Sequence, residues 1–232
     1  MSLSRDTRFV TEPFEIPDEL RAEGLVFFRS PQTRRSLIAL AQSLGQIVPH
    51  RDSDSDGITV IEDRAKSQLE YRGLTNLALD LHTDRSSEEL PPRLILNYCT
   101  FAAADGGEVV LADARTAYDI LSRTQPRVIS LLEQPDAVGF SDGSKTLVAP
   151  VLSRDESGRM RVRFKFDSSL VANEDTWWAL KHFKAVTDEH SLHISLRQGE
   201  GYVIDNSWWL HGRRQFSGNR QVLRLHIQPI DD

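Results

Sequence analysis

The chain has 232 residues, of which 39% are hydrophobic and 27% charged, so it contains enough apolar material for a sizeable core. The formal net charge of −6 argues against a nucleic-acid partner, which normally leaves a basic footprint. Cys99 is the only cysteine and excludes an internal disulfide. No segment approaches the roughly 18 apolar residues of a membrane helix, and the N-terminus has no stretch typical of a signal peptide. We therefore expect a cytoplasmic protein without a membrane partner.

The first third of the chain predicts a strand, a helix and a long irregular segment. Residues 24–28 form an apolar run that is typical of a short buried strand. Residues 30–44 have helical spacing, with Ser30 as the expected cap and Gly45 as the expected end. Residues 49–73 are charged and irregular, with a short strand expected at 58–61, and we interpret them as a loop or lid insertion.

The remainder of the chain is rich in strand patterns. Helices are expected at 114–122, 126–132 and 176–190. Strands are expected at 94–98, 109–111, 138–140, 146–151, 160–166, 193–196, 201–204 and 221–228. Strands and helices do not alternate regularly, which favours a mainly β fold with flanking helices, a barrel or jelly roll, over a doubly wound sheet. We expect a single domain over residues 1–232.

Three residues form a candidate metal site. His82 and Asp84 are two positions apart, so on an extended segment both side chains point to the same side. His211 follows a predicted strand and lies between apolar residues and a glycine. A surface histidine beside a solvated aspartate, and a buried structural histidine, are the alternative interpretations. Two histidines and one carboxylate on one face of an octahedron are the arrangement of non-haem iron(II) oxygenases, although zinc would accept the same ligands.

Two arginines follow on the last predicted strand. Arg220 and Arg224 have an even separation, so both can project to one face of that strand. Arginine is always charged and binds a carboxylate through two parallel hydrogen bonds. The pair therefore suits an anchor for a carboxylate, while a polar face that is simply exposed to water explains the pattern equally well.

At this point the chain resembles a known family, the TauD/TfdA family of taurine-dioxygenase-like 2-oxoglutarate oxygenases. Three blocks carry the resemblance: Leu81-His82-Thr83-Asp84 with Pro91-Pro92 and Gly106-Gly107-Glu108-Val109; Ala112-Asp113 with Ala117-Tyr118 and Leu121; and Asp205-Asn206, Leu210-His211-Gly212-Arg213, Phe216, Arg220 and Arg224. These blocks, with the region 24–44, cover most of the chain.

The resemblance implies a double-stranded β-helix, which is a cupin-like jelly roll, with Fe(II) bound by His82, Asp84 and His211. It also implies 2-oxoglutarate as co-substrate. The family pattern favours Arg220 for the far carboxylate, with Arg224 reaching the co-substrate or the substrate. Members often have a threonine after the Gly-Gly-acidic stretch, bound to the co-substrate. Val109 takes that position here, so one polar contact is missing or supplied elsewhere.

The expected reaction is hydroxylation of an unactivated carbon, with 2-oxoglutarate and O2 consumed and succinate and CO2 released. A small amino acid or a natural-product intermediate is the expected substrate, by family analogy. Arg85, Ser86, Asp205 and Trp208 are the candidate substrate contacts, although a solvated Arg85 and a core Trp208 are at least as plausible. A non-catalytic or zinc-binding jelly-roll module, and a relative that catalyses desaturation or cyclisation, are the alternatives. The sequence does not indicate the oligomeric state.

Overall fold

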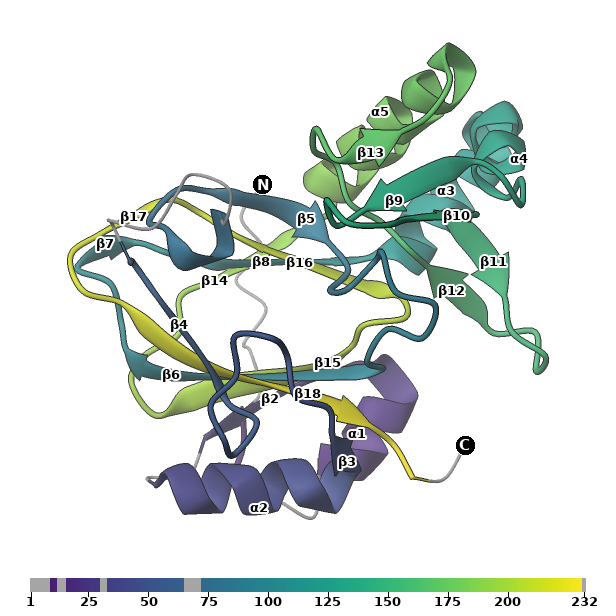
Figure 1. Ribbon diagram of the computed structural model, residues 1–232. Coiled ribbons are helices and arrows are strands. Elements are labelled where there is room, and N and C mark those ends of the chain that lie inside the picture. Colours follow the sequence, from purple (N-terminus) through teal and green to yellow (C-terminus); the bar gives the residue numbers. More distant parts are fainter. Residues whose placement is uncertain (1–8, 12–15, 30–32, 65–71, 231–232) are drawn as a thin grey trace.

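Two β-sheets face each other in this computed structural model, which describes residues 9–11, 16–29, 33–64 and 72–230 (Figure 1). The larger sheet has the strand order β1-β2-β15-β6-β18-β3, and β4 also pairs with β18. Its strands are β1 (Phe9–Val10), β2 (Leu25–Arg29), β3 (Gln46–Ile47), β4 (Thr59–Glu62), β6 (Leu94–Phe101), β15 (Glu200–Asp205) and β18 (Gln221–Gln228).

The smaller sheet has the order β14-β8-β16-β5 and carries the two predicted histidine ligands. Its strands are β5 (Leu79–His82), β8 (Val109–Asp113), β14 (Leu192–Ile194) and β16 (Trp209–Arg213). His211 on β16 is paired directly with His82 on β5, and directly opposed residues of neighbouring strands point to the same face. The sheet pairing therefore brings together two histidines that are 129 positions apart (211 minus 82).

Two helices cover the outer face of the larger sheet, α1 (Ile16–Glu23) and α2 (Arg34–Leu44) (Figure 1). The side chain of Thr33 caps α2 by accepting a hydrogen bond from the backbone N–H of Ser36 at 3.1 Å. The cap expected at Ser30 lies outside the described residues. Gly45 ends the helix as predicted, with a φ of 154° that is not helical. A side chain there would not fit, because a Cβ would lie 2.3 Å from the carbonyl oxygen of Gln228.

A second group of elements packs beside the smaller sheet (Figure 1). It contains the helices α3 (Ala114–Thr124), α4 (Pro126–Leu132) and α5 (Glu174–Glu189). Its strands are β9 (Val138–Ser141), β10 (Thr146–Ala149), β11 (Leu152–Arg154), β12 (Met160–Val162) and β13 (Leu170–Val171). The short pair β7 (Asp105–Gly106) and β17 (Phe216–Ser217), and the 3₁₀ turn η2 (Arg72–Leu74), complete the described elements.

The apolar residues form two cores, one on each side of the molecule. The first lies between the smaller sheet and α3, α4 and α5, with Phe140, Phe164 and Phe183 fully buried. The second lies between the larger sheet and α1 and α2, with Leu37 and Leu225 fully buried. Residues of the larger sheet, among them Phe27, Ile95 and Ile204, also belong to the first core, so apolar contacts join part of the two sheets. The predicted arginines Arg220 and Arg224 line a cavity between the sheets.

This architecture confirms the predicted mainly β fold with flanking helices, a jelly roll. The segment 49–73 is more integrated than a simple insertion, because β4 lies within it and pairs with β18 in the larger sheet. Residues 65–71 of that segment lie outside the described residues, and its role as a lid stays a prediction. In the described part of the chain, no helix has the length and apolarity that crossing a bilayer requires.

Candidate metal centre

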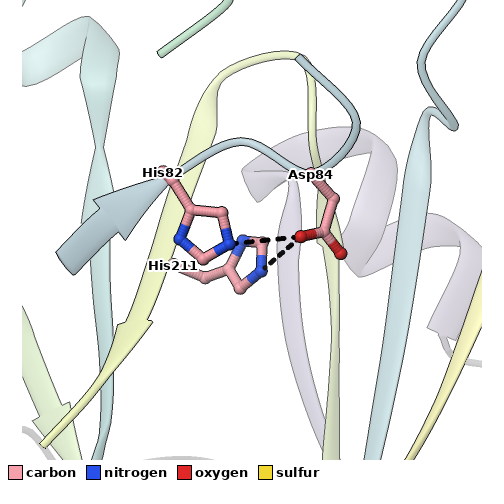
Figure 2. Close-up of side chains that lie close together, drawn as sticks. All are labelled: His82, Asp84 and His211. Carbon is pink, nitrogen blue, oxygen red and sulfur yellow. Dashed lines mark hydrogen bonds and ion pairs between the residues drawn. The ribbon is translucent and has the colours of Figure 1, made fainter. Parts of the chain in front are cut away.

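Two histidines and one carboxylate meet at the edge of the smaller sheet (Figure 2). His82 is the last residue of β5, and His211 lies in the middle of β16. Asp84 lies two positions after His82, and its Oδ1 lies 3.2 Å from Nε2 of His82 and 3.4 Å from Nε2 of His211. Adjacent ligands of an octahedral ion with bonds of about 2.1 Å would lie about 3 Å apart, so this spacing fits one shared metal.

The residue between the two ligands explains why they face the same side. Thr83 points away from the site and pairs with Phe164 on the chain beyond β12. Its backbone N–H donates to the carbonyl of Phe164 at 2.7 Å, and its Oγ1 accepts from the N–H of Phe164 at 3.0 Å. This pairing holds the segment extended, so the side chains of His82 and Asp84 project together on the opposite side.

The chemistry of both imidazoles suits a metal ligand. Nδ1 of His82 lies 2.9 Å from the carbonyl oxygen of Asp80, an arrangement that places the proton on Nδ1 and leaves the Nε2 lone pair free. Both ring nitrogens of His211 are buried without a hydrogen-bond partner in the described part of the chain. Burial and the neighbouring His82 lower the pKa of His211 to about 3, so the ring is neutral at pH 7. A metal bound to Nε2, the nitrogen that faces Asp84, would give this buried atom a partner.

Asp84 is an ionised carboxylate despite its burial. Burial opposes its ionisation, but Arg224 and His211, together with the hydrogen bond from His226, hold its pKa well below the usual range. Nη1 of Arg224 and Nε2 of His226 each lie 2.8 Å from Oδ2, the oxygen that faces away from His82 and His211. Two neutral histidines and one carboxylate would leave a divalent ion with a net charge of about +1.

Asn206 fixes the backbone of the ligand carboxylate. Its Oδ1 accepts a hydrogen bond from the N–H of Asp84 at 2.8 Å, and its Nδ2 donates to the carbonyl of Asp84 at 3.1 Å. The same Nδ2 donates to the carbonyl of Pro92 at 2.9 Å. Asn206 directly follows β15, so this one side chain ties the loop after β5 to the larger sheet.

A cavity extends from His211 between the two sheets. Its lining residues are Ile61, Gly73, Leu79, Asn97, Val109, Leu196, Tyr202, His211, Gly212, Arg213, Arg220, Val222 and Arg224. Burial raises the pKa of Tyr202 to about 12, so this phenol stays protonated and can donate a hydrogen bond. The cavity thus joins one metal ligand to both arginines that the sequence singled out.

Arg220 is a buried cation for which the described residues provide no counter-charge. Its relative exposure is 9%, and burial lowers its pKa. Its guanidinium lies 5.6 Å from the ring centre of Phe216, but none of the described residues forms an ion pair or hydrogen bond with it. Gly107 makes room for it, because a Cβ there would lie 3.1 Å from Cδ of Arg220. A buried unpaired guanidinium is a strong site for an anion.

The other cavity arginines are already engaged. Arg224 donates to Asp84, and its Nε donates to Oδ1 of Asn97 at 3.0 Å. Arg213 donates from Nη2 to the backbone carbonyls of Thr75 at 2.6 Å and Leu77 at 2.7 Å. Arg213 therefore holds the segment before β5 in place.

The four candidate substrate contacts do not line this cavity. Arg85 has a left-handed backbone (φ 57°), and its Nε donates to Glu88 at 2.6 Å. Ser86 is buried, and the guanidinium of Arg163 donates to its carbonyl at 2.6 Å. Asp205 accepts a hydrogen bond from Nε of Arg93 at 3.1 Å. The guanidinium of Arg115 lies over the ring of Trp208, 4.8 Å from its centre. All four contact other parts of the protein, and their role in substrate binding stays a prediction.

The fold and this site define a jelly-roll protein with a two-histidine, one-carboxylate metal centre. The family described as "Taurine catabolism dioxygenase TauD, TfdA family" matches residues 14–226, and the chain belongs to this family. This membership confirms the resemblance seen in the sequence motifs.

Relatives of known name are distant and longer. The chain is 24% identical over 187 residues to trimethyllysine dioxygenase of Meyerozyma guilliermondii, a match that covers 73% of this chain and 46% of the relative. It is 27% identical over 212 residues to gamma-butyrobetaine dioxygenase of Pseudomonas sp. strain AK-1, with 85% of this chain and 54% of the relative covered. The chain thus spans about half the length of these curated relatives.

Solved structures share the fold. A structure of asparagine oxygenase with Fe(II), 2S,3S-3-hydroxyasparagine and succinate matches with a TM-score of 0.78 and 16% identity, covering 93% of this chain and 78% of the other. A structure of the non-haem iron oxygenase OrfP with Fe and alpha-ketoglutaric acid matches with a TM-score of 0.72 and 16% identity, covering 93% and 79%.

The sequence motifs left the supporting residues unassigned. His226 shares the alternating face of β18 with Arg224, which the sequence pattern indicates, but its contact with Asp84 spans 142 positions and has no local signal. Asn206 lies in a motif, but its contact with Asp84 spans 122 positions and has no local signal. Asn97 and Tyr202 lie opposite each other on β6 and β15, inside strands whose central residues are buried on both faces, where alternation is hidden.

Proposed function

We propose that this protein is an Fe(II)- and 2-oxoglutarate-dependent oxygenase that hydroxylates an unactivated carbon of a small, amino-acid-like substrate. One observation carries the proposal: the cavity that begins at His211 of the metal centre also contains Arg220, a buried guanidinium with no described counter-charge. A metal site alone would suit zinc, but zinc has no need of a buried anion site beside it.

Different residues would bind the metal and the far end of the co-substrate. His82, Asp84 and His211 would hold Fe(II), which supplies the activation of O2 that is coupled to decarboxylation of 2-oxoglutarate to succinate and CO2. Arg220 would bind the far carboxylate, since Arg224 is occupied by Asp84 and Asn97.

The apolar side chains between these two ends suit the methylene carbons of 2-oxoglutarate. Val109, Leu196 and Val222 line this stretch and would exclude water from it. Val109 replaces the expected threonine with an apolar contact, and the buried phenol of Tyr202 lines the same cavity and can supply a polar contact.

The substrate class rests on the relatives. Trimethyllysine dioxygenase, gamma-butyrobetaine dioxygenase and asparagine oxygenase are named for amino acids or amino-acid derivatives. A comparable small molecule would approach the open side of the metal, where Arg85, Ser86, Asp205 and Trp208 remain the proposed contacts. Desaturation or cyclisation is the alternative outcome, which product analysis distinguishes. The cytoplasmic location also stays a prediction.

The direct test is anaerobic addition of Fe(II) and 2-oxoglutarate to the protein. We expect a weak visible absorption band near ~500 nm, typical of a chelated iron site, which zinc would not give. Admission of O2 with a panel of amino acids and their derivatives should then release succinate. His82→Ala should lose both the band and the succinate. Full coupled turnover by His82→Ala would refute the metal assignment.

A further inference from the structure

The two oxygens of the Asp84 carboxylate have different surroundings. Oδ1 faces the two imidazoles of the metal centre, as Figure 2 shows. Oδ2 faces the larger sheet, where Arg224 and His226 each approach it to 2.8 Å. The carboxylate is thus held from behind by β18 while its front oxygen lies between His82 and His211.

His226 is built to stay in this position. It is only 4% exposed and lies on β18 directly opposite Ile95 of β6. The ring of His50 packs edge-on against it, with ring centres 5.7 Å apart and an interplanar angle of 77°. An ionised carboxylate can only accept hydrogen bonds, so Nε2 of His226 must carry the proton and donate to Asp84.

Arg224 is the second donor to the same oxygen, and it also lines the cavity. Its Nε donates a hydrogen bond to Oδ1 of Asn97 at 3.0 Å. His226 is absent from the cavity lining and has no such competing role in the described structure. An anion bound in the cavity could therefore compete with Asp84 for Arg224 but not for His226.

We propose that His226 is a positioning residue that restricts Asp84 to binding the metal through Oδ1 alone. This inference rests on the proposed metal site. With Oδ2 bonded to His226, the three protein ligands occupy three positions of an octahedral ion and leave three for a chelating co-substrate and O2. If Oδ2 also bound the metal, a fourth position would be filled and one of these ligands would be excluded.

The test compares Co(II) binding by the wild-type protein with that of His226→Leu and His226→Phe, which lack the donor but differ in shape. We expect Co(II) affinity to fall about 10- to 100-fold in both. Infrared spectra of Co(II)-loaded protein labelled with ¹³C-aspartate report the binding mode. The antisymmetric and symmetric carboxylate stretches should be well separated in the wild-type protein and closer together in the variants, as Asp84 becomes bidentate.

Two further variants separate positioning from simple stability. His226→Gln keeps an N–H donor and should restore most of the Co(II) affinity and the wide separation. Leu225→Ala weakens the apolar core on the other face of β18, so it should lower the Tm and leave Co(II) affinity within twofold of the wild-type value.

The outcomes distinguish this inference from the metal site itself. Wild-type protein that binds no Co(II) would overturn the proposed function. Wild-type binding with unchanged affinity and stretch separation in folded His226→Leu or His226→Phe would overturn only the role of His226. If both variants fail to fold, His226→Gln decides: wild-type affinity and separation support positioning, and a loss like that of Asp84→Ala overturns it.

Discussion

Arg220 places a positive charge between the two sheets without a described carboxylate to balance it. Burial of an unpaired charge is costly, and the lowered pKa of Arg220 reflects that cost. A residue that destabilises the ligand-free protein in this way is explained by a ligand that neutralises it. Function and stability should therefore respond in opposite directions when this side chain is replaced.

Arg220→Met should make the ligand-free protein more stable, by about 1–3 kcal/mol, since an apolar side chain of similar length replaces a buried unpaired charge. The same change should weaken 2-oxoglutarate binding by ~2–5 kcal/mol, the cost of removing one partner of a buried charged pair. Urea unfolding measures the first effect, and calorimetric titration of the Co(II)-loaded protein measures the second.

Arg214→Met is the matched control for this prediction, because Arg214 is exposed and loses the same charge without touching the cavity. It should change neither quantity appreciably. A less stable Arg220→Met protein that still binds 2-oxoglutarate as tightly as wild type would contradict the assignment of the far carboxylate to Arg220.

At the scale of the elements, the position of Asp84 depends on the loop that follows β5. Asp84 lies outside any strand, yet its carboxylate must face the two histidines. Asn206 solves this by bonding both backbone groups of Asp84 and the carbonyl of Pro92. Arg163 adds hydrogen bonds to the backbone of Ser86 and Glu89 further along the same loop. These hydrogen bonds hold the proposed ligand Asp84 in place although it lies outside any strand.

Asn206→Ala should therefore lower both stability and metal affinity. It leaves the buried N–H and carbonyl of Asp84 without partners, at about 1–3 kcal/mol for each group, so we expect a loss of ~3 kcal/mol in the free energy of unfolding. Metal affinity per folded molecule should also fall, because Asp84 is no longer oriented. Urea unfolding and Co(II) titration measure the two effects.

Asn173→Ala provides the same substitution away from the metal. Asn173 caps α5 by accepting a hydrogen bond from the N–H of Thr176 at 2.8 Å, so its loss should cost ~1 kcal/mol. Its Co(II) affinity should match that of the wild-type protein. Equal metal affinity in Asn206→Ala and Asn173→Ala would show that Asn206 serves stability alone.

The elements also show which parts of the fold have a local signal. The helix α4 and the strand β18 begin and end where the sequence patterns predicted, because apolar spacing and Pro126 mark them clearly. The strands β5 and β16 were not predicted as strands, although they carry two ligands. Every residue of β16 is buried, so it lacks the alternation of a half-exposed strand.

For the site, the sequence predicted the metal-binding residues but not the residues that support them. The ligands His82, Asp84 and His211 come from motifs, and the structure brings them together. Their supports depend on contacts across the sheets, such as the hydrogen bond from His226 to Asp84, which spans 142 positions. No local pattern encodes such a contact. The cap of α2 was assigned to Ser30, whereas Thr33 caps the observed helix, since both residues suit that role by type.

At the scale of the whole molecule, the proposed metal ion and 2-oxoglutarate would connect the two sheets. His82 and His211 belong to the smaller sheet, whereas Arg224 lies on β18 of the larger sheet and Arg220 directly precedes it. One apolar core lies between the larger sheet and α1 and α2, and the other contains residues of both sheets and of α3, α4 and α5. The cavity between the sheets contains the charged side chains of Arg213, Arg220 and Arg224, so a metal ion and a dicarboxylate bound there would add bonds between the two sheets.

Binding of Co(II) and 2-oxoglutarate should consequently stabilise the protein against heat. A ligand at 100 times its Kd adds about 2.7 kcal/mol, which corresponds to a rise in Tm of about 5–10 °C for a domain of this size. Thermal unfolding under anaerobic conditions measures the rise, and a chelator should reverse it. Asp84→Ala should show almost none of the rise, because it lacks the only carboxylate among the three ligands. A wild-type Tm that ignores both ligands, or an equal rise in Asp84→Ala, would mean that the two sheets are not joined through this site.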